Sequence, residues 1–257
     1  MPSIGSVVHI YNEEMLLPFW IKHHLPLYEK MIFIDHRCTD NSLDIIRELA
    51  PEALVLPTRL ADFNAGQVDH EVMEVEARYL NTDWKICSNI TEFMWCKDLQ
   101  EVLNELPEEI RALKFHAYMM VDNQSSPLEG SLWKDRTHGY LDDGSALNSR
   151  RARFIHREQH GAYGLGRHNT AHLSSGDSTH NILFASFSPW PQAINRKLQV
   201  QTQIPISDKQ AGSGIQHIQN PETLNNFYHS ELIKSTDLLL DSNFKRNYDY
   251  YMSLGDN

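Results

Sequence analysis

Short apolar runs that end in polar residues recur through the first hundred residues of this chain. Runs of this kind are typical of buried strands, and we place them at residues 4–10, 31–35, 53–56 and 85–87. Apolar residues at helical spacing lie between them, at 13–23, 42–49 and 67–80. Because strands and helices alternate, the sequence predicts an α/β fold with a mainly parallel, twisted sheet and helices on both faces.

Two predictions concern the start of the first helix. Asn12 has a side chain that commonly caps a helix, which would place the first turn at Glu13 and Glu14. Pro18 lacks a backbone N–H group, so we expect a kink or an early end there.

The pattern changes after residue 97. The expected elements are a helix at 97–106, a strand at 112–121, an irregular segment at 123–148, a strand at 151–156, and helices at 191–203 and 221–240. No internal repeat is visible. We therefore predict one domain over residues 1–257, divided into a first half, 1–96, and a second half, 97–257, whose C-terminal helices form a lobe.

Composition and charge narrow the function. A chain of 257 residues with 41% hydrophobic content can bury a sizeable core. Its net charge of −11 argues against a nucleic-acid partner, because nucleic-acid readers carry a dominant basic surface. The three cysteines form no CxxC pair, which fits a reducing, cytoplasmic location. The sequence begins without a signal-peptide pattern and has no run of about 20 apolar residues, so we expect no transmembrane segment and leave peripheral membrane contact open.

Polar residues follow three of the expected strands directly. The three strand ends read His-Ile-Tyr-Asn-Glu-Glu at 9–14, Asp-His-Arg-Cys-Thr-Asp at 35–40, and Ser-Asn-Ile-Thr-Glu-Phe at 88–93. In open α/β sheets, ligands bind at the carboxyl ends of the strands. Each stretch alone is also what a capped helix or a turn would show, but the three in order predict one shared site.

These stretches, in this order, resemble the donor-binding part of family 2-like glycosyltransferases of the GT-A fold. The resemblance rests on the Tyr-Asn-Glu-Glu signature at 11–14 and on the aspartate-rich turn at 35–42, and it extends more loosely over the rest of the chain. It implies that residues 1–96 bind a UDP- or GDP-sugar and that 97–257 form the acceptor half. The donor-binding residues that we expect are His9, Tyr11, Asn12, Glu13, Asp35, Asp40, Asp62, Asn89, Thr91, Arg153 and His168.

The chain departs from that family at the third strand end. Relatives carry D-x-D-E-F there, and the aspartates bind a divalent metal that bridges the donor phosphates. This chain has Asn89 and Thr91 in their places and keeps Glu92. Since Mg²⁺ and Mn²⁺ prefer carboxylate oxygens, the motif does not support a metal, and we assign no metal ligand. Glu92 is either a catalytic residue or a cap of the following helix.

Arginines and histidines gather at 150–172. Arginine forks can bind phosphate oxygens in place of a metal, although a solvated face of surface ion pairs is about as plausible. Two histidine pairs at i, i+4 spacing, 156/160 and 168/172, could bind zinc if helical, but the glycines before His168 favour a loop, so a zinc hydrolase is a weak alternative.

The expected activity is transfer of a sugar from a nucleotide-diphosphate donor to a glycan or lipid-linked acceptor, with inversion. Such a reaction needs a carboxylate base. The catalytic candidates are Glu92 and Asp208, and Asp122, Asp135 and Asp177 carry the same chemistry. Trp133, Tyr163 and Trp190 are either sugar platforms or core residues. The alternative function is a catalytically inactive relative that binds a nucleotide or glycan.

Overall fold

The structure is a computed structural model of the 257-residue chain. It describes residues 1–126, 128–129, 131–142, 151–176, 179–210 and 219–254.

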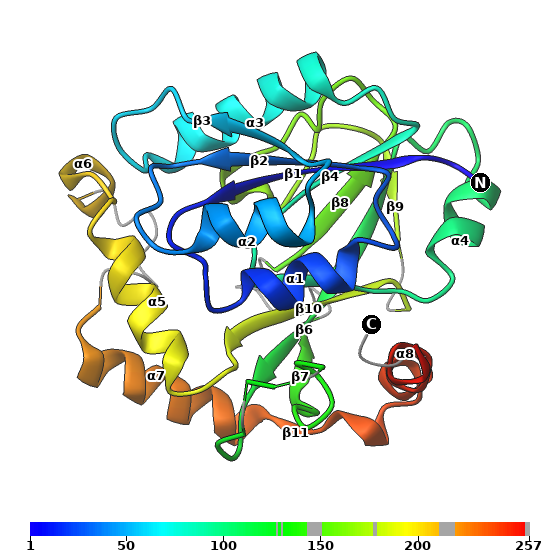
Figure 1. Ribbon diagram of the computed structural model, residues 1–257. Coiled ribbons are helices and arrows are strands. Elements are labelled where there is room, and N and C mark those ends of the chain that lie inside the picture. The colour runs from blue at the N-terminus through cyan, green and yellow to red at the C-terminus, as the bar shows by residue number, and fades with distance from the viewer. Residues whose placement is uncertain (127, 130, 143–150, 177–178, 211–218, 255–257) are drawn as a thin grey trace.

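The first half is a parallel sheet with helices on both faces. Its strands are β1 (Ile4–Ile10), β2 (Lys30–Asp35), β3 (Leu54–Pro57) and β4 (Trp84–Ser88), in the order β3-β2-β1-β4. The connecting helices are α1 (Leu17–His24), α2 (Ser42–Leu49) and α3 (Ala65–Tyr79). Figure 1 shows α3 on one face of these strands and α1 and α2 on the other.

The second half extends the same sheet with mixed pairing. The strand β8 (Arg153–His156) pairs antiparallel with β4, and β6 (Ala112–Val121) pairs antiparallel with β8. On the far side of β6, β10 (Asn181–Phe187) runs parallel to it, and β5 (Glu92–Trp95) pairs antiparallel with β10. The remaining strands are β7 (His138–Asp142), β9 (Ser174–Ser175) and β11 (Thr236–Asp237).

Helices of the second half lie around this extension. They are α4 (Leu99–Glu105), α5 (Gln192–Gln201), α6 (Ile206–Gln210), α7 (Pro221–Lys234) and α8 (Ser242–Ser253), with 3₁₀ turns at η1 (Leu165–Arg167) and η3 (Leu238–Leu240). Among the described residues, no helix is long and apolar enough to cross a membrane. The predicted α/β class, with helices on both faces of a mixed and mostly parallel sheet, is confirmed.

Strand alternation divides the buried side chains of β1 between two cores. Val8 and Ile10 pack on the side of α1 and α2, in a large cluster that continues through β5, β6 and α8. Val7 packs with Val72 and Val75 of α3 on the opposite face. Since successive side chains of a strand point to opposite faces, a strand covered on both faces is buried throughout, as β1 is, with Ser6 and His9 as its polar members.

The structure differs from the sequence prediction in several details. Asn12 has a positive φ of 51° and caps no helix, because α1 begins later, at Leu17. Pro18 neither kinks nor ends the helix, because it lies in the first turn of α1, where a missing N–H group costs nothing. Glu92 begins a strand instead of capping a helix. The segment expected to be irregular contains β7, the expected helix at 221–240 ends at Lys234, and β10 was not predicted.

Candidate functional site

The carboxyl ends of β1, β2 and β4 lie side by side. In the register of the sheet, Ile10 pairs with Asp35 and Val8 pairs with Ser88. Parallel strands end at one edge of a sheet, so Tyr11, Asp35 and Asn89 all follow strands at the same edge. Figure 1 shows the arrows of β1 and β2 pointing toward the side on which α5 and α6 lie.

Four rings cluster at the ends of β1 and β2. The His9 ring lies 5.2 Å from the His36 ring and 4.9 Å from the Phe63 ring, between centroids. Phe63 and Tyr11 lie 5.0 and 6.1 Å from His36. Phe63 belongs to the loop between β3 and α3. We call His9, Tyr11, His36 and Phe63 the ring cluster, in which His9 and His36 are buried and Tyr11 and Phe63 are partly exposed.

The two histidines of the ring cluster are neutral at physiological pH. Burial lowers the pKa of His36 to about 4, helped by the neighbouring His9 and Arg37. Burial also lowers the pKa of His9, against the opposing effect of Glu71, whose Oε2 is 3.5 Å from His9 Nε2. Both ring nitrogens of His36 are buried without a hydrogen-bond partner among the described residues. An imidazole in this state can donate or accept a hydrogen bond to a ligand.

Asn12, Asp35 and Asp40 hold together the loops that follow β1 and β2. Asn12 Oδ1 accepts from the backbone N–H of Thr39 at 2.7 Å, and Asp35 Oδ1 accepts from the N–H of Cys38 at 2.8 Å. Asp40 Oδ2 accepts from the N–H of Glu14 at 3.0 Å. These contacts position the loops, and direct contact of these three residues with a donor stays a prediction.

Helix α5 and the turn after it connect the second half of the chain to these loops. Arg196 donates to both carboxylate oxygens of Glu13, at 2.8 and 2.6 Å. Gln203 donates to the hydroxyl of Tyr11 at 3.0 Å, and its carbonyl accepts from the N–H of Phe63 at 2.9 Å. Two of the expected donor-binding residues, Tyr11 and Glu13, are therefore held by the second half.

Glu92 is buried in a two-pronged ion pair with Arg153. Nε and Nη2 of Arg153 each lie 2.6 Å from a Glu92 oxygen, and the backbone N–H of Asn89 donates to the same carboxylate at 2.8 Å. Burial by itself would raise the pKa of Glu92, but the Arg153 charge and these hydrogen bonds hold it below its usual value. Glu92 therefore stays ionised and accepts several hydrogen bonds.

Arg167 forms a second buried pair beside the first. It donates to Asp69 of α3 and, at 2.7 Å, to the side-chain oxygen of Asn89. His168 follows, with Nδ1 at 3.1 Å from Nη1 of Arg153. Burial and then the Arg153 charge lower the pKa of His168 to about 3, so its imidazole is neutral.

The residues at the third strand end do not fit a hard divalent cation. The Asn89 oxygen accepts from Arg167, and both oxygens of Glu92 accept from Arg153. Two guanidinium groups thus already supply positive charge where a cation would lie, and they would repel it. In the described part of the chain, no three His, Cys, Asp or Glu side chains are grouped so that they could hold a metal ion.

The remaining expected site residues lie apart from these pairs. Thr91 is buried, and its carbonyl accepts from the N–H of Ala185 on β10. Asp62 is exposed in the loop after β3. Asp208 accepts from Asn64 Nδ2 at 2.6 Å and from the N–H of Ala65 at 2.9 Å, so it caps the start of α3. Its catalytic role stays a prediction.

The other base candidates differ in environment. Asp122 is buried at the end of β6, accepts from Ser188 and from the N–H of Trp190, and has a pKa raised by burial. Trp190 stacks on Tyr228 at 4.1 Å and 8°, which leaves a flat aromatic pair near this carboxylate. Asp135 is exposed, and Asp177 lies outside the described residues.

The arginine- and histidine-rich segment does not act as one clamp. Arg157 stacks over Trp84 at 4.4 Å, and His156 lies 3.5 Å from the buried Glu76. Tyr163, a predicted sugar platform, donates to the same Glu76, and Trp133 is a core residue. Arg150 lies outside the described residues. Four cationic or polar residues at the site were not predicted from the sequence, namely His36, Arg196, Lys197 and Gln203. Of these, only His36 could have been found from the sequence, because strand alternation places it near His9.

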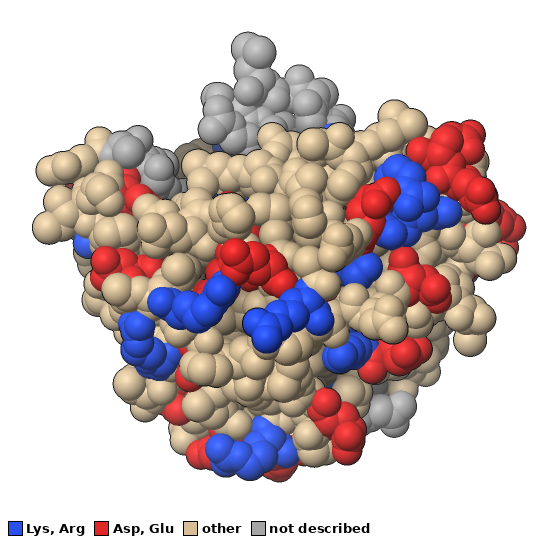
Figure 2. Space-filling view, turned by 90° about the horizontal axis from the view of Figure 1, so that it is seen from above, with Lys and Arg blue, Asp and Glu red and all other residues tan. Residues whose placement is uncertain are grey.

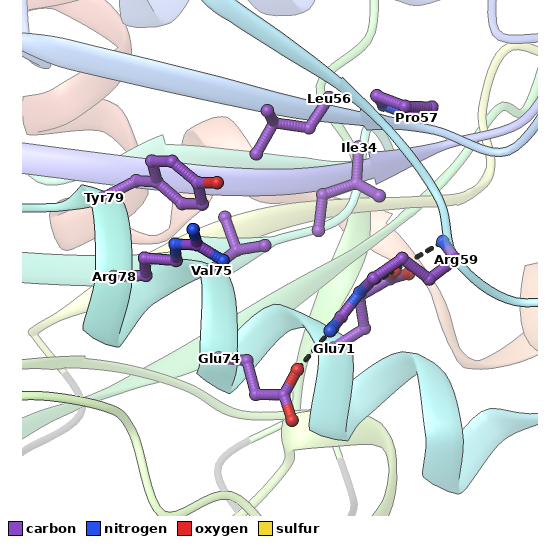
Figure 3. Close-up of a pocket in the computed structure, with 9 residues that line it drawn as sticks. All are labelled: Ile34, Leu56, Pro57, Arg59, Glu71, Glu74, Val75, Arg78 and Tyr79. Atoms are coloured by element: carbon purple, nitrogen blue, oxygen red, sulfur yellow. Dashed lines mark hydrogen bonds and ion pairs between the residues drawn. The ribbon is translucent and has the colours of Figure 1, made fainter.

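A separate pocket of about 230 Å³ opens between β2, β3 and α3. Figure 3 shows Arg59 pointing toward Glu71 and Glu74 along one wall, with Ile34 and Leu56 on the strands opposite. The face of the molecule drawn in Figure 2 has acidic and basic side chains interspersed. Arg59 is paired with Glu71 and Glu74, and the Arg78 guanidinium lies 5.2 Å from the centre of the Tyr79 ring.

Comparisons with known proteins give structural similarity without sequence similarity. No protein-family model and no curated protein sequence matches the chain. Mannosyltransferase PcManGT from Pyrobaculum calidifontis, solved with GDP-Man and Mn²⁺, is similar over 79% of this chain and 61% of its own, with 10% identity and a TM-score of 0.47.

Two further solved structures are similar over a smaller part. Glucosyl-3-phosphoglycerate synthase from Mycobacterium tuberculosis, solved with Mn²⁺, UDP and glucosyl-3-phosphoglycerate, matches 46% of this chain and 44% of its own, with 17% identity and a TM-score of 0.35. Mannosyl-3-phosphoglycerate synthase from Rubrobacter xylanophilus matches 61% and 53%, with 10% identity and a TM-score of 0.38. This chain thus spans between 44% and 61% of the length of these three structures.

Proposed function

We propose that the chain is a glycosyltransferase that binds a nucleoside-diphosphate sugar at the carboxyl ends of β1, β2 and β4. The observation that carries this proposal is the ring cluster, which combines aromatic faces with unpartnered imidazole nitrogens at one edge of a sheet. Neutral rings suit a nucleobase, which stacks on aromatic faces and hydrogen-bonds at its edges.

The reaction that fits this site is transfer of the sugar to a hydroxyl of a glycan or a lipid-linked acceptor, with inversion. It needs stabilisation of the leaving diphosphate and a carboxylate that accepts the acceptor proton. Asp122 is the candidate for the second role. Burial raises its pKa against the opposing effects of Ser188, Trp190 and Arg136, whose Nε lies 3.4 Å from Oδ2 of Asp122. The Trp190–Tyr228 pair lies beside this carboxylate.

Titration calorimetry with UDP, GDP and the two nucleosides tests the binding step. Base stacking on an aromatic side chain is worth about 1–3 kcal/mol, so His36→Ala and Phe63→Leu each weaken nucleotide binding by about tenfold or more. His70→Ala is the matched control, because His70 lies on α3 with a side chain 76% exposed. Absence of binding of either nucleotide at millimolar concentration to the folded protein would overturn the proposal.

A second candidate function is nucleotide binding without turnover. The observation that favours it is Glu92, whose two oxygens are both taken by Arg153. Release of free sugar from UDP- and GDP-sugars separates the two functions. Slow donor hydrolysis that Asp122→Asn abolishes supports the enzyme, and nucleotide binding with no hydrolysis or transfer of any donor supports the binding protein.

A further inference from the structure

Two cationic side chains at the site have no acidic partner. Lys197 of α5 is 7% exposed, and its Nζ lies 5.0 Å above the ring of Phe187. Arg151, just before β8, is partly buried with its guanidinium 5.0 Å above the ring of Phe184. Within the described part of the chain, neither side chain donates a hydrogen bond or forms an ion pair, although the protein is acidic overall.

Both supporting rings lie on the same face of β10. In the pairing of β10 with β6, Phe184 is opposite Met119 and Phe187 is opposite Val121. Three steps on β10 therefore match two steps on β6, which is the arrangement of a β-bulge. Residues two apart on a strand share a face, so Met119 and Val121 do, and the bulge gives Phe184 and Phe187 a common face as well.

Burying these cations without a partner is unfavourable for the protein alone. Burial, with smaller effects from the charges of Arg196 and Arg151, lowers the pKa of Lys197 from its ordinary value of 10.5 to about 7. Burial likewise lowers the pKa of Arg151, partly offset by Glu92. Charged groups inside proteins are normally paired, so this pair is missing an anion.

Among the described residues, no carboxylate forms an ion pair with Lys197. Arg196 on the same helix is engaged by Glu13, Arg151 approaches from the segment before β8, and β10 contributes the Phe187 ring. Glu13 and Glu92 are each held by both oxygens in arginine pairs. In the described structure, the carboxylates that act on Arg151 are Glu92 and Asp142, neither of which forms an ion pair with it.

Helix α5 links these cations to the ring cluster. Lys197 lies four residues before the end of α5 at Gln201, roughly 6 Å along the helix at 1.5 Å per residue, and Gln203, which contacts Tyr11 and Phe63, lies in the turn that follows. A ligand with a planar base at the ring cluster and an anionic group some distance away would therefore span both places.

We propose that Lys197 and Arg151 bind the diphosphate of the donor. Their positive charge takes the place of a divalent metal ion, for which Asn89 and Thr91 offer no carboxylate ligands. The inference rests on the proposed function for its ligand. The site takes a diphosphate group and functions without a divalent cation, because the cations that neutralise the diphosphate are part of the chain. On binding, the phosphate oxygens accept hydrogen bonds from both side chains, and Lys197 takes up a proton from solvent.

The test is titration calorimetry of UDP, GDP and inorganic pyrophosphate against the whole chain at pH 8, in EDTA and in MnCl₂. Repeating each titration in buffers of different ionisation enthalpy measures proton uptake. The variants are Lys197→Met, which keeps the apolar stem over Phe187, and Arg151→Gln. Lys245→Met and Arg246→Gln on α8 remove the same charges from side chains that are 53% and 51% exposed, and they serve as controls. Thermal melting confirms that each variant is folded.

The expected result is binding of pyrophosphate and nucleotide in EDTA with uptake of about one proton. Lys197→Met weakens binding at least tenfold and removes the proton uptake, Arg151→Gln also weakens binding, and the controls change neither. Nucleotide binding that requires Mn²⁺, or that is unchanged in both variants, overturns this inference and leaves the proposed function standing. Binding of pyrophosphate without either nucleotide overturns the proposed function and keeps the anion site.

Discussion

Replacing Glu92 with glutamine should destabilise the protein strongly. The change keeps the shape of the side chain but leaves the Arg153 charge buried without its counter-ion, in a pair where both side chains are at most 2% exposed. Removing one partner of a buried pair costs about 3–5 kcal/mol. We therefore expect Glu92→Gln to lower the free energy of unfolding by this amount, measured by urea denaturation with an unchanged m-value.

A double-mutant cycle shows whether the loss comes from the pair. Arg153→Met should cost a similar amount, because it leaves the Glu92 charge unpaired. Glu92→Gln combined with Arg153→Met removes both charges, so the double variant should be more stable than the sum of the single losses predicts, with a coupling energy of about 2–3 kcal/mol. A loss below about 1 kcal/mol in Glu92→Gln, or a coupling energy near zero, would refute the view that this ion pair holds the third strand end.

The Glu92–Arg153 pair also makes the stability of the protein depend on pH. The pKa of Glu92 is below its ordinary value in the folded protein, so the unfolded chain binds a proton that the folded one does not. The stabilisation from ionised Glu92 is therefore present at pH values above the ordinary carboxyl pKa and is lost as the pH falls through the lowered pKa of Glu92. Wild-type stability should fall below about pH 4 more steeply than that of the double variant.

Three further results are expected. Lys197→Met should raise the free energy of unfolding at pH 6. The upper bound of this gain is roughly 5 kcal/mol, for a pKa that falls from 10.5 in the unfolded chain to about 7 in the folded protein, and the gain should shrink as the pH rises toward 10. A gain that does not vary with pH would contradict the burial of a charged lysine. Asp208→Ala should lower the free energy of unfolding by about 1–3 kcal/mol, because it leaves the backbone amide of Ala65 in α3 unpaired, and Asp208→Asn should lower it less. If Asp208→Asn is stable but no longer hydrolyses the donor, Asp208 is the catalytic base. Asn89→Asp should not create a Mn²⁺ site measurable by electron paramagnetic resonance, because Arg167 would bind the new carboxylate; micromolar Mn²⁺ affinity would disprove this.

The sequence predicted the first half of the fold better than the second. The strand at 4–10 agrees with β1 because parallel strands covered on both faces are rich in apolar residues, a pattern that Ile4, Val7, Val8 and Ile10 show in the sequence. The sheet order also placed Tyr11, Asp35 and Asn89 at one edge. In the second half, β7 lies in a polar segment whose strand character comes from pairing with β6, and no local pattern marks it.

The partners of the site residues could not be predicted. Arg196 and Lys197 are adjacent on α5, yet one binds Glu13, 183 positions earlier, and the other lies over Phe187. Which of two neighbouring cations meets a carboxylate depends on how the helix docks, and that is a tertiary property. Arg153 was expected to bind the donor, and Arg167 belonged to a set for which phosphate binding and surface ion pairs were both left open; in the structure they form buried ion pairs with Glu92 and Asp69.

The strand β4 has a consequence for how the protein can be divided. One edge of β4 pairs with β1, and the other is covered by β8, which is made some seventy residues later. A fragment that stops at residue 96 would expose this edge to pairing with other chains and would leave Glu13 and Glu92 without their arginines. The first half therefore depends on the second for its strand edge and its buried ion pairs, and any fusion or truncation should keep both halves together.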